Sequence, residues 1–289
     1  MNASTARYGP LALAVVCVST GSILVRLAHA PPLAVSFHRV FLASILLAPF
    51  GAAAALRHWP TLGRRERLVL AMAGLALALH FATWIASLSY TSVAASVLLV
   101  NMAPLFTLLL SWAFLGEGVS RVVLVALAMA LGGASVIAAG DWSRGPEPLK
   151  GDLLALAGAV ALSIYHVVGR GLREALPLAP YVLGVWSIAA LTLGLLAVSA
   201  SVPLVGYSTR TMLVLFALAL VPTLFGHGLV NRSLRLLPAP VVGLFLLGEP
   251  LGASILAYAL FGEVPSHWTL AGGTLVLGAL VLVALPGPR

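Results

Sequence analysis

Long apolar runs separated by short polar connections make up most of the chain. Each run holds about 20 residues, the length that an α-helix needs to cross the roughly 30 Å of hydrocarbon in a membrane. Proline, glycine and charged residues mark the ends of the runs. The pattern predicts an all-α membrane protein of ten transmembrane helices with short loops and no soluble domain. The predicted spans are residues 10–27, 35–56, 68–88, 92–115, 121–139, 152–170, 180–200, 212–231, 238–261 and 268–285.

The composition supports the same class. Of the 289 residues, 61% are hydrophobic and 8% are charged, whereas about a quarter of a soluble domain is charged. The net charge of +8 does not indicate a nucleic-acid partner, because the basic residues are scattered between apolar runs. The single cysteine, Cys17, lies in an apolar run and excludes a disulfide framework or a cysteine-based metal site. No cofactor is expected, and membrane lipid is the expected surrounding.

The basic residues also predict an orientation. Most of the Lys and Arg residues fall in alternate connections, above all in "LRHWPTLGRRER" at residues 56–67. Because such residues stay on the cytoplasmic side of a membrane, both termini are expected to be cytoplasmic. The N-terminal segment ends in an A-x-A-like site at residues 28–30, but Arg26 just before it favours an uncleaved first helix over a signal peptide.

The chain contains an internal repeat. Three landmarks of the segment "NMAPLFTLLLSWAFLGEGVS" and its continuation recur 146 residues later, so that Pro104, Glu117 and Gly132 correspond to Pro250, Glu263 and Gly278. Each half holds five predicted spans, and an odd number of spans makes the two halves enter the membrane in opposite directions. The sequence therefore predicts two inverted repeats, residues 10–140 and 152–286, joined by a linker at 141–151. Such repeats place the substrate site of many secondary transporters near the midplane of the membrane.

These duplicated motifs resemble the paired repeats of EamA-type transporters in the drug/metabolite transporter superfamily. "GSILVRLAHAPPLAVSFHRVFLASILL" is also similar to the opening helix pair of that family. The resemblance extends over essentially the whole chain. It implies ten helices around a central cavity lined mainly by helices one, three, four, six, eight and nine. It also implies export of small metabolites such as amino acids across the inner membrane.

Glu249 is the candidate site residue with the most unusual surroundings. It lies in "GLFLLGEPLGAS" with only apolar or small neighbours, and Pro250 interrupts the helix beside it. A carboxylate at this depth is costly unless it faces a cavity or a partner. Glu249 is thus either a binder of a substrate amine or a coupling proton, or a structural carboxylate held by a neighbouring helix.

Other polar residues at mid-membrane are further candidates for the cavity wall. His80 and Trp84 lie one turn apart on the third span and share a face. Each candidate is weighed against a structural role, since a buried His or amide is often satisfied by a neighbouring helix and Tyr is common at interfaces. The remaining candidates are Asn101 on the fourth span, Tyr165 and His166 on the sixth, and His227 and Asn231 on the eighth.

Two arginines lie towards the outer ends of the first two spans. Arg26 and Arg39 are expected to extend to the membrane interface, and Arg26 is the better candidate for an outer gate or for binding a substrate carboxylate. Glu117 and Glu263 follow glycine at helix ends and are expected to be caps or loop anchors. The small residues of the fifth and tenth spans and of Gly248-x-x-x-Gly252 permit close helix packing and are compatible with a homodimer.

A secondary transporter exporting amino acids or similar small metabolites accounts best for these features. An exporter of lipophilic or cationic drugs, or of another small metabolite, stays an alternative. An intramembrane enzyme is disfavoured because the sequence has no metalloprotease motif, no nucleophile elbow and no acid–base pair at mid-membrane. A channel is disfavoured because no repeated ring of polar groups is evident.

Overall fold

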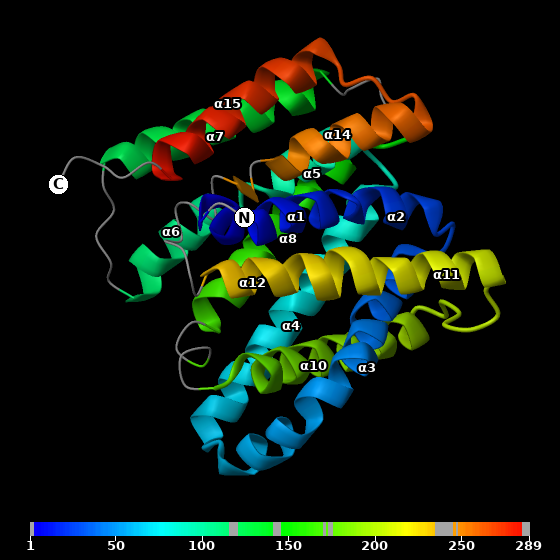
Figure 1. Cartoon of the computed structure of the whole chain (residues 1–289). Coiled ribbons are helices and arrows are strands. Elements are labelled where there is room, and N and C mark those ends of the chain that lie inside the picture. The colour runs from blue at the N-terminus through cyan, green and yellow to red at the C-terminus, as the bar shows by residue number, and fades with distance from the viewer. Residues whose placement is uncertain are drawn as a thin grey trace.

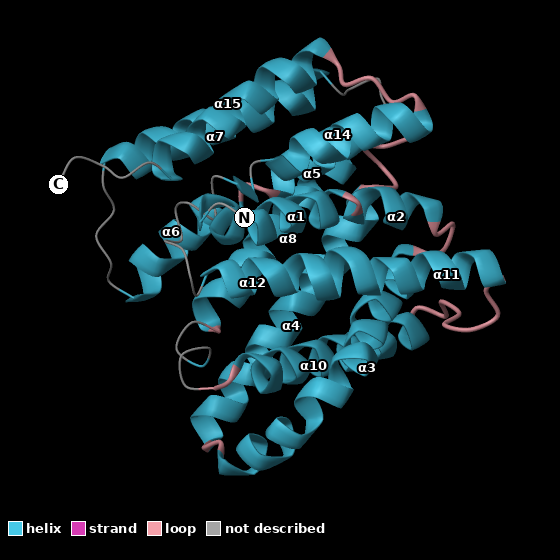
Figure 2. Cartoon of the chain, in the orientation of Figure 1, coloured by secondary structure: helices cyan, strands magenta, loops and turns pink. Residues whose placement is uncertain are grey.

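The described part of the chain is helical throughout. The structure, a computed structural model, describes residues 3–115, 121–140, 146–169, 172, 176–234, 245–246 and 248–284. Helix makes up 86% of it and no strand occurs among these residues (Figure 2). Apolar side chains such as Leu191 and Ile255 remain exposed on its surface, as expected where lipid replaces water.

The helices follow the predicted spans in order (Figure 1). Those of the first half are α1 (Ala3–Ser19), α2 (Gly21–Leu27), α3 (Pro32–His58) with the short η1 (Trp59–Thr61), α4 (Arg64–Ser87), α5 (Val93–Val100), α6 (Ala103–Leu115) and α7 (Arg121–Gly140). Those of the second half are α8 (Pro148–Val168), α10 (Leu178–Ser199), α11 (Thr209–Leu218), η2 (Ala219–His227), α12 (Gly228–Leu234), α14 (Gly248–Phe261) and α15 (His267–Ala284).

Seven of these segments are long and apolar enough to cross a membrane. They correspond to the first four predicted spans and to the sixth, seventh and eighth. The fifth and tenth are present as α7 and α15, whose apolar stretches are shorter. The ninth is described as α14, because residues 235–244 lie outside the described part of the chain. The prediction of a polytopic all-α membrane protein is therefore confirmed.

Contacts between the helices follow a reciprocal pattern. The third span packs against the sixth through α4 and α8, and the eighth packs against the first through η2 and α1. The second span packs against the seventh through α3 and α10, and the fifth against the tenth through α7 and α15. Exchanging the first five spans for the last five, in order, turns the first two of these pairs into each other and the last two into themselves. Helix α1 begins and α15 ends at the same end of the bundle (Figure 1).

Proline residues interrupt two spans near their middle. The fourth span breaks into α5 and α6 at Asn101 and Met102, just before Pro104, which has no N–H to donate to the carbonyl of Val100. The eighth span widens into the π-helical segment η2 around Pro222. Local π-helical turns often mark functional sites. The residues beside both interruptions are therefore candidates for a functional site.

Glycine residues allow the closest helix contacts. A Cβ on Gly133 would lie 2.5 Å from the carbonyl oxygen of Gly272, so α7 and α15 touch backbone to backbone. On α14, a Cβ on Gly248 would lie 2.9 Å from Val15, and one on Gly252 would overlap Ser19, both on α1. The predicted close packing of these small residues is confirmed, and the described contacts lie within one chain.

Gly133→Ala should lower the free energy of unfolding by about 1–3 kcal/mol, because the new methyl group has no room against backbone atoms. The matched control is Gly132→Ala on the next residue of the same helix, where a Cβ would meet nothing within 4 Å. Unfolding of both variants in detergent, compared with that of the unmodified protein, measures the effect. Equal stability of the two variants would contradict the described α7–α15 contact.

Candidate functional site

The central feature of the bundle is a buried arginine. Arg39 on α3 is only 2% exposed, so the expectation that it extends to the membrane interface is wrong. Its Nε donates to Thr223 Oγ1 at 2.9 Å, and its Nη2 lies 3.2 Å from His227 Nε2. These partners lie on η2, so the second and eighth spans meet at the guanidinium. A buried cation needs such partners, because removing it from water costs several kcal/mol.

Two aromatic rings of α4 complete the surroundings of this guanidinium. Its central carbon lies 4.3 Å from the centroid of the Phe81 ring and 5.3 Å from that of Trp84. Both rings are almost fully buried. Cation–π attraction is strongest where water is excluded, so the rings stabilise the charge of Arg39 without supplying a counter-ion.

The π-helical segment explains why Thr223 can take part. Pro222 has no N–H for the carbonyl of Leu218, and Thr223 Oγ1 donates to that oxygen instead, at 2.9 Å. The hydroxyl then has lone pairs left to accept the Nε–H of Arg39. His227 lies four residues further along the same segment, which puts both acceptors on one side of it.

Several buried donors in this region have no hydrogen-bond partner in the described part of the chain. They are Nη1 of Arg39, Nε1 of Trp84 and the hydroxyl of Ser22 on α2. Ser22 follows Gly21, which lies against Trp84 and Pro222. Unpaired buried polar atoms are rare in native proteins and call for an explanation.

His80 holds Trp84 in place. The two rings are stacked with 3° between their planes and 5.9 Å between their centroids, so the prediction that they share a face is confirmed. His80 Nδ1 lies 2.9 Å from the carbonyl oxygen of Gly158 on α8. A Cβ on Gly158 would lie 3.1 Å from that of Trp84. These contacts join the third and sixth spans and orient the indole.

The carboxylate of Glu249 lies close to the same cluster. It belongs to the first turn of α14 and is partly buried, and the Asn101 side chain lies close to it. Asn101 Nδ2 also donates to the carbonyl of Val97 at 2.9 Å. Arg39 is near enough to interact electrostatically with Glu249, yet the pair does not come within ion-pair distance. The structure thus brings Asn101, at the break in the fourth span, close to Glu249 on the ninth span.

Tyr165 and His166 are consecutive residues of α8. Their rings are tilted, with centroids 5.3 Å apart, and both side chains are partly buried. His166 is close enough to His227 to interact electrostatically, as are Arg39 and His80. The side-chain surroundings of Asn231 are not described.

Arg26 belongs to a different polar network, at the end of the bundle where α2 and α14 end. It forms an ion pair with Glu263, and its Nη2 donates to the carbonyl of Thr91 at 2.8 Å. Glu263 also accepts the backbone N–H of Val93 at 2.6 Å, and Thr91 Oγ1 donates to the buried Asp152 of α8 at 2.9 Å. The prediction that Glu263 is a cap is confirmed, because it caps the first turn of α5. Glu117 lies outside the described residues.

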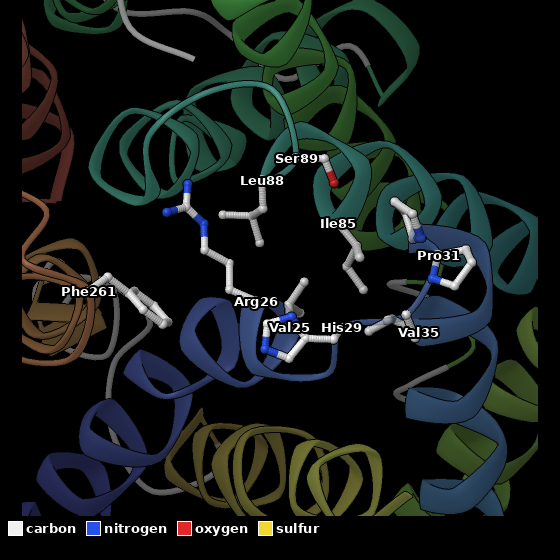
Figure 3. A pocket seen from close by; sticks show the side chains of 11 residues that line it. Val25, Arg26, His29, Pro31, Val35, Ile85, Leu88, Ser89 and Phe261 are labelled. Atoms are coloured by element: carbon white, nitrogen blue, oxygen red, sulfur yellow. The ribbon is translucent and has the colours of Figure 1, made fainter. Parts of the chain in front are cut away.

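A cavity of about 500 Å³ lies beside this network. Figure 3 shows Arg26 on one side of it, with the guanidinium flanked by Leu88 and Phe261, and with Val25, Ile85 and Val35 around the apolar remainder. His29 and Ser89 add polar groups to its wall. The network and the cavity thus lie together at one end of the bundle.

Arg39 is thus buried where the sequence predicted an interfacial side chain, and the residues predicted from the sequence did not include Phe81 or Thr223. Phe81 adjoins His80 and carried no polar signal. A proline at position 222 in the middle of an otherwise regular span is the one feature that could have drawn attention to Thr223. Among the described residues no cluster of His, Cys, Asp or Glu side chains suits a metal ion.

The chain is similar to known proteins in sequence and in fold. The sequence model described as the EamA-like transporter family matches residues 10–139 and again 149–285. An uncharacterized transporter of Archaeoglobus fulgidus is 29% identical over 288 residues, 96% of each chain. A probable terminal-alkyne amino-acid exporter of Streptantibioticus cattleyicolor is 29% identical over 194 residues, which are 64% of this chain and 62% of the exporter. A crystal structure with 21% sequence identity covers 96% of each chain with a TM-score of 0.66, a likeness of fold.

The Arg26–Glu263 pair should contribute measurably to stability. In a double-mutant cycle of Arg26→Gln and Glu263→Gln in detergent, we expect a coupling energy of about 1–3 kcal/mol, because both side chains are mostly buried and share further hydrogen bonds. The matched control is the exposed pair Lys150–Glu147, for which no measurable coupling is expected. Additive effects of the Arg26 and Glu263 substitutions would contradict the described network.

Proposed function

Because the chain belongs to the EamA-like transporter family, we propose that it is a secondary-active transporter that exports amino acids or similar small metabolites by alternating access. The chain is a multi-pass membrane protein and a transporter rather than an enzyme. The substrate, the direction, the inner membrane and the cytoplasmic termini belong to the proposal.

The proposed architecture is that of ten transmembrane helices in two inverted repeats, residues 10–140 and 152–286. The reciprocal pairing of the spans supports it, since the pairs exchange with one another when the halves are exchanged. The family model matches the chain twice, over nearly the same ranges. The start of α1 and the end of α15 at one end of the bundle agree with two termini on one side of the membrane.

Alternating access needs the two halves to close one end of the path at a time. The Arg26 network has the composition of such a closure, because Arg26 and Thr91 come from the first half and Glu263 and Asp152 from the second. With cytoplasmic termini, this network closes the outer end. The proposed role of Arg26 is therefore that of an outer gate, and the substrate is bound further in.

The observation that carries the substrate proposal is the pair of Glu249 and Asn101 beside the buried Arg39. Glu249 offers a carboxylate to a substrate amine, and the carbonyl oxygen of Asn101 is a second acceptor. The buried Arg39 near Glu249 disfavours a purely cationic drug, because such a molecule would bring a second cation to the guanidinium without an anion. The relative that is named an amino-acid exporter supports the same substrate class and the same direction.

Glu249 is also the proposed carrier of a coupling proton. Ionisable side chains within membrane-spanning segments mark proton relays, and Glu249 lies in such a segment, close to Asn101 and within electrostatic range of Arg39. The carboxyl group therefore has reason to exchange a proton as its surroundings change during transport. Export driven by an inward proton gradient is the expected consequence.

Counterflow of labelled amino acids in proteoliposomes tests the proposal. The unmodified protein should exchange at least one amino acid of the panel, and an imposed pH gradient should change the rate. Exchange of no amino acid would contradict the proposed substrate class. An unaffected rate under the gradient would contradict proton coupling.

Glu249→Gln should reduce this exchange to the level of empty liposomes, because the amide cannot hold a substrate amine by charge or release a proton. Glu147→Gln, which changes an exposed carboxylate, is the control and should leave exchange unchanged. Membrane insertion and the elution profile in detergent should be the same for both variants. Normal exchange by the Glu249 variant would overturn its assigned role.

A further inference from the structure

We propose that Arg39 and Trp84 form a site for the carboxylate group of the transported substrate. This inference rests on the proposed function and deepens it, because it names the acidic group that the substrate must carry. On the sequence alone Arg26 was preferred to Arg39 for this role, and Trp84 was a candidate for the cavity wall.

The Arg39 guanidinium has more N–H donors than it has hydrogen-bond acceptors in the described part of the chain. An arginine side chain carries five N–H groups. Arg39 uses the Nε–H for Thr223 and directs Nη2 at His227. Nη1, which carries two of the five, has no partner among the described residues, although the side chain is only 2% exposed. A ligand that accepts hydrogen bonds would remove the cost of leaving these donors unpaired.

A second unpaired donor lies beside the first. The indole Nε1 of Trp84 has no partner, and the ring is 4% exposed with its centroid 5.3 Å from the guanidinium carbon. His80 and Gly158 fix the ring, as described above. Two donors that are fixed before the ligand arrives lose little entropy on binding, which is the property expected of a recognition site.

The charge around Arg39 indicates which ligand group accepts these hydrogen bonds. Arg39 has aromatic rings, a hydroxyl and an imidazole as neighbours but no carboxylate within ion-pair distance in the described part of the chain. A buried cation without an anion is strongly unfavourable. A carboxylate supplies the charge, and its two oxygens can accept from Nη1 and from the indole at once. Glu249 and Asn101 remain available for the amine of the same molecule.

The position of Arg26 separates it from this role. Its guanidinium is already paired with Glu263 and Thr91 at one end of the bundle. Arg39 has no such pairing and shares its surroundings with Glu249. Carboxylate recognition at Arg39 and closure at Arg26 are therefore separable by experiment.

The test compares matched substrates in proteoliposomes. For an amino acid that exchanges in the counterflow panel, the competitors are the amino acid itself, its α-amide and its decarboxylated amine. The unmodified protein should prefer the amino acid by roughly 10- to 100-fold, the range expected when a charged hydrogen-bonded group is lost. Arg39→Gln should abolish that preference, and Trp84→Phe, which keeps an aromatic ring but removes the N–H, should reduce it about fivefold.

Two control variants distinguish recognition from folding. Arg26→Gln removes the other arginine, and Trp186→Phe makes the same change at a buried tryptophan of α10. Both should keep the preference for the amino acid, whatever their effect on rate. Loss of exchange of the acid and the amide in equal proportion in the Trp84→Phe variant, or an unchanged preference in the Arg39→Gln variant, would overturn the proposal.

A direct binding measurement does not depend on amino-acid export. In detergent, 4-methylpentanoate should raise the melting temperature of the unmodified protein more than the uncharged 4-methylpentanamide does. The difference should shrink in Trp84→Phe and persist in Trp186→Phe. Equal shifts with acid and amide in the unmodified protein would refute the carboxylate site. A difference between them combined with no amino-acid exchange would instead refute the proposed function alone.

Discussion

The burial of one guanidinium organises the centre of this protein. A membrane-spanning helix that carries a cation away from the interface needs polar or aromatic partners from its neighbours. Arg39 obtains them from α4 and η2, at Phe81, Trp84 and Thr223. These elements come from both halves of the chain, so the surroundings of Arg39 constrain how the halves meet. The reciprocal helix pairs around the centre pack apolar and small side chains against each other. These contacts require less specific residues than the surroundings of Arg39 do.

Interruptions of helices supply the polar atoms that this arrangement needs. A continuous helix satisfies its own carbonyl and amide groups and has little to offer a ligand. Pro104 and Pro222 break that regularity, and the polar side chains next to them, Asn101 and Thr223, lie at the centre. Glu249 precedes a third proline in the first turn of α14. Prolines thus mark the places where side chains are exposed to the centre of the bundle.

The sequence predicted the helices and their order because hydrophobic length is the dominant signal in a membrane. It also predicted the capping role of Glu263 and the shared face of His80 and Trp84, which depend on local spacing. It failed at Arg39, because distance from a helix end does not show which neighbours a side chain meets. Thr223 was missed for a related reason: its role depends on a carbonyl freed by Pro222 and on a guanidinium 184 residues earlier in the chain.

The duplicated scaffold and the central cluster differ in symmetry. The helix pairs exchange when the halves are exchanged, but the polar residues do not. At the repeat offset of 146, Glu249 corresponds to Ala103, Asn101 to Leu247 and Arg39 to Val185. A site with two equal halves would bind a molecule in two opposite orientations with equal ease. Because the first half supplies the guanidinium and the second the carboxylate, the central cluster has a direction, and the proposed substrate, with one acidic and one basic group, would fit it in a single orientation. In the proposed mechanism the near-symmetric scaffold provides the motion of the two halves, and the unequal residues select the substrate.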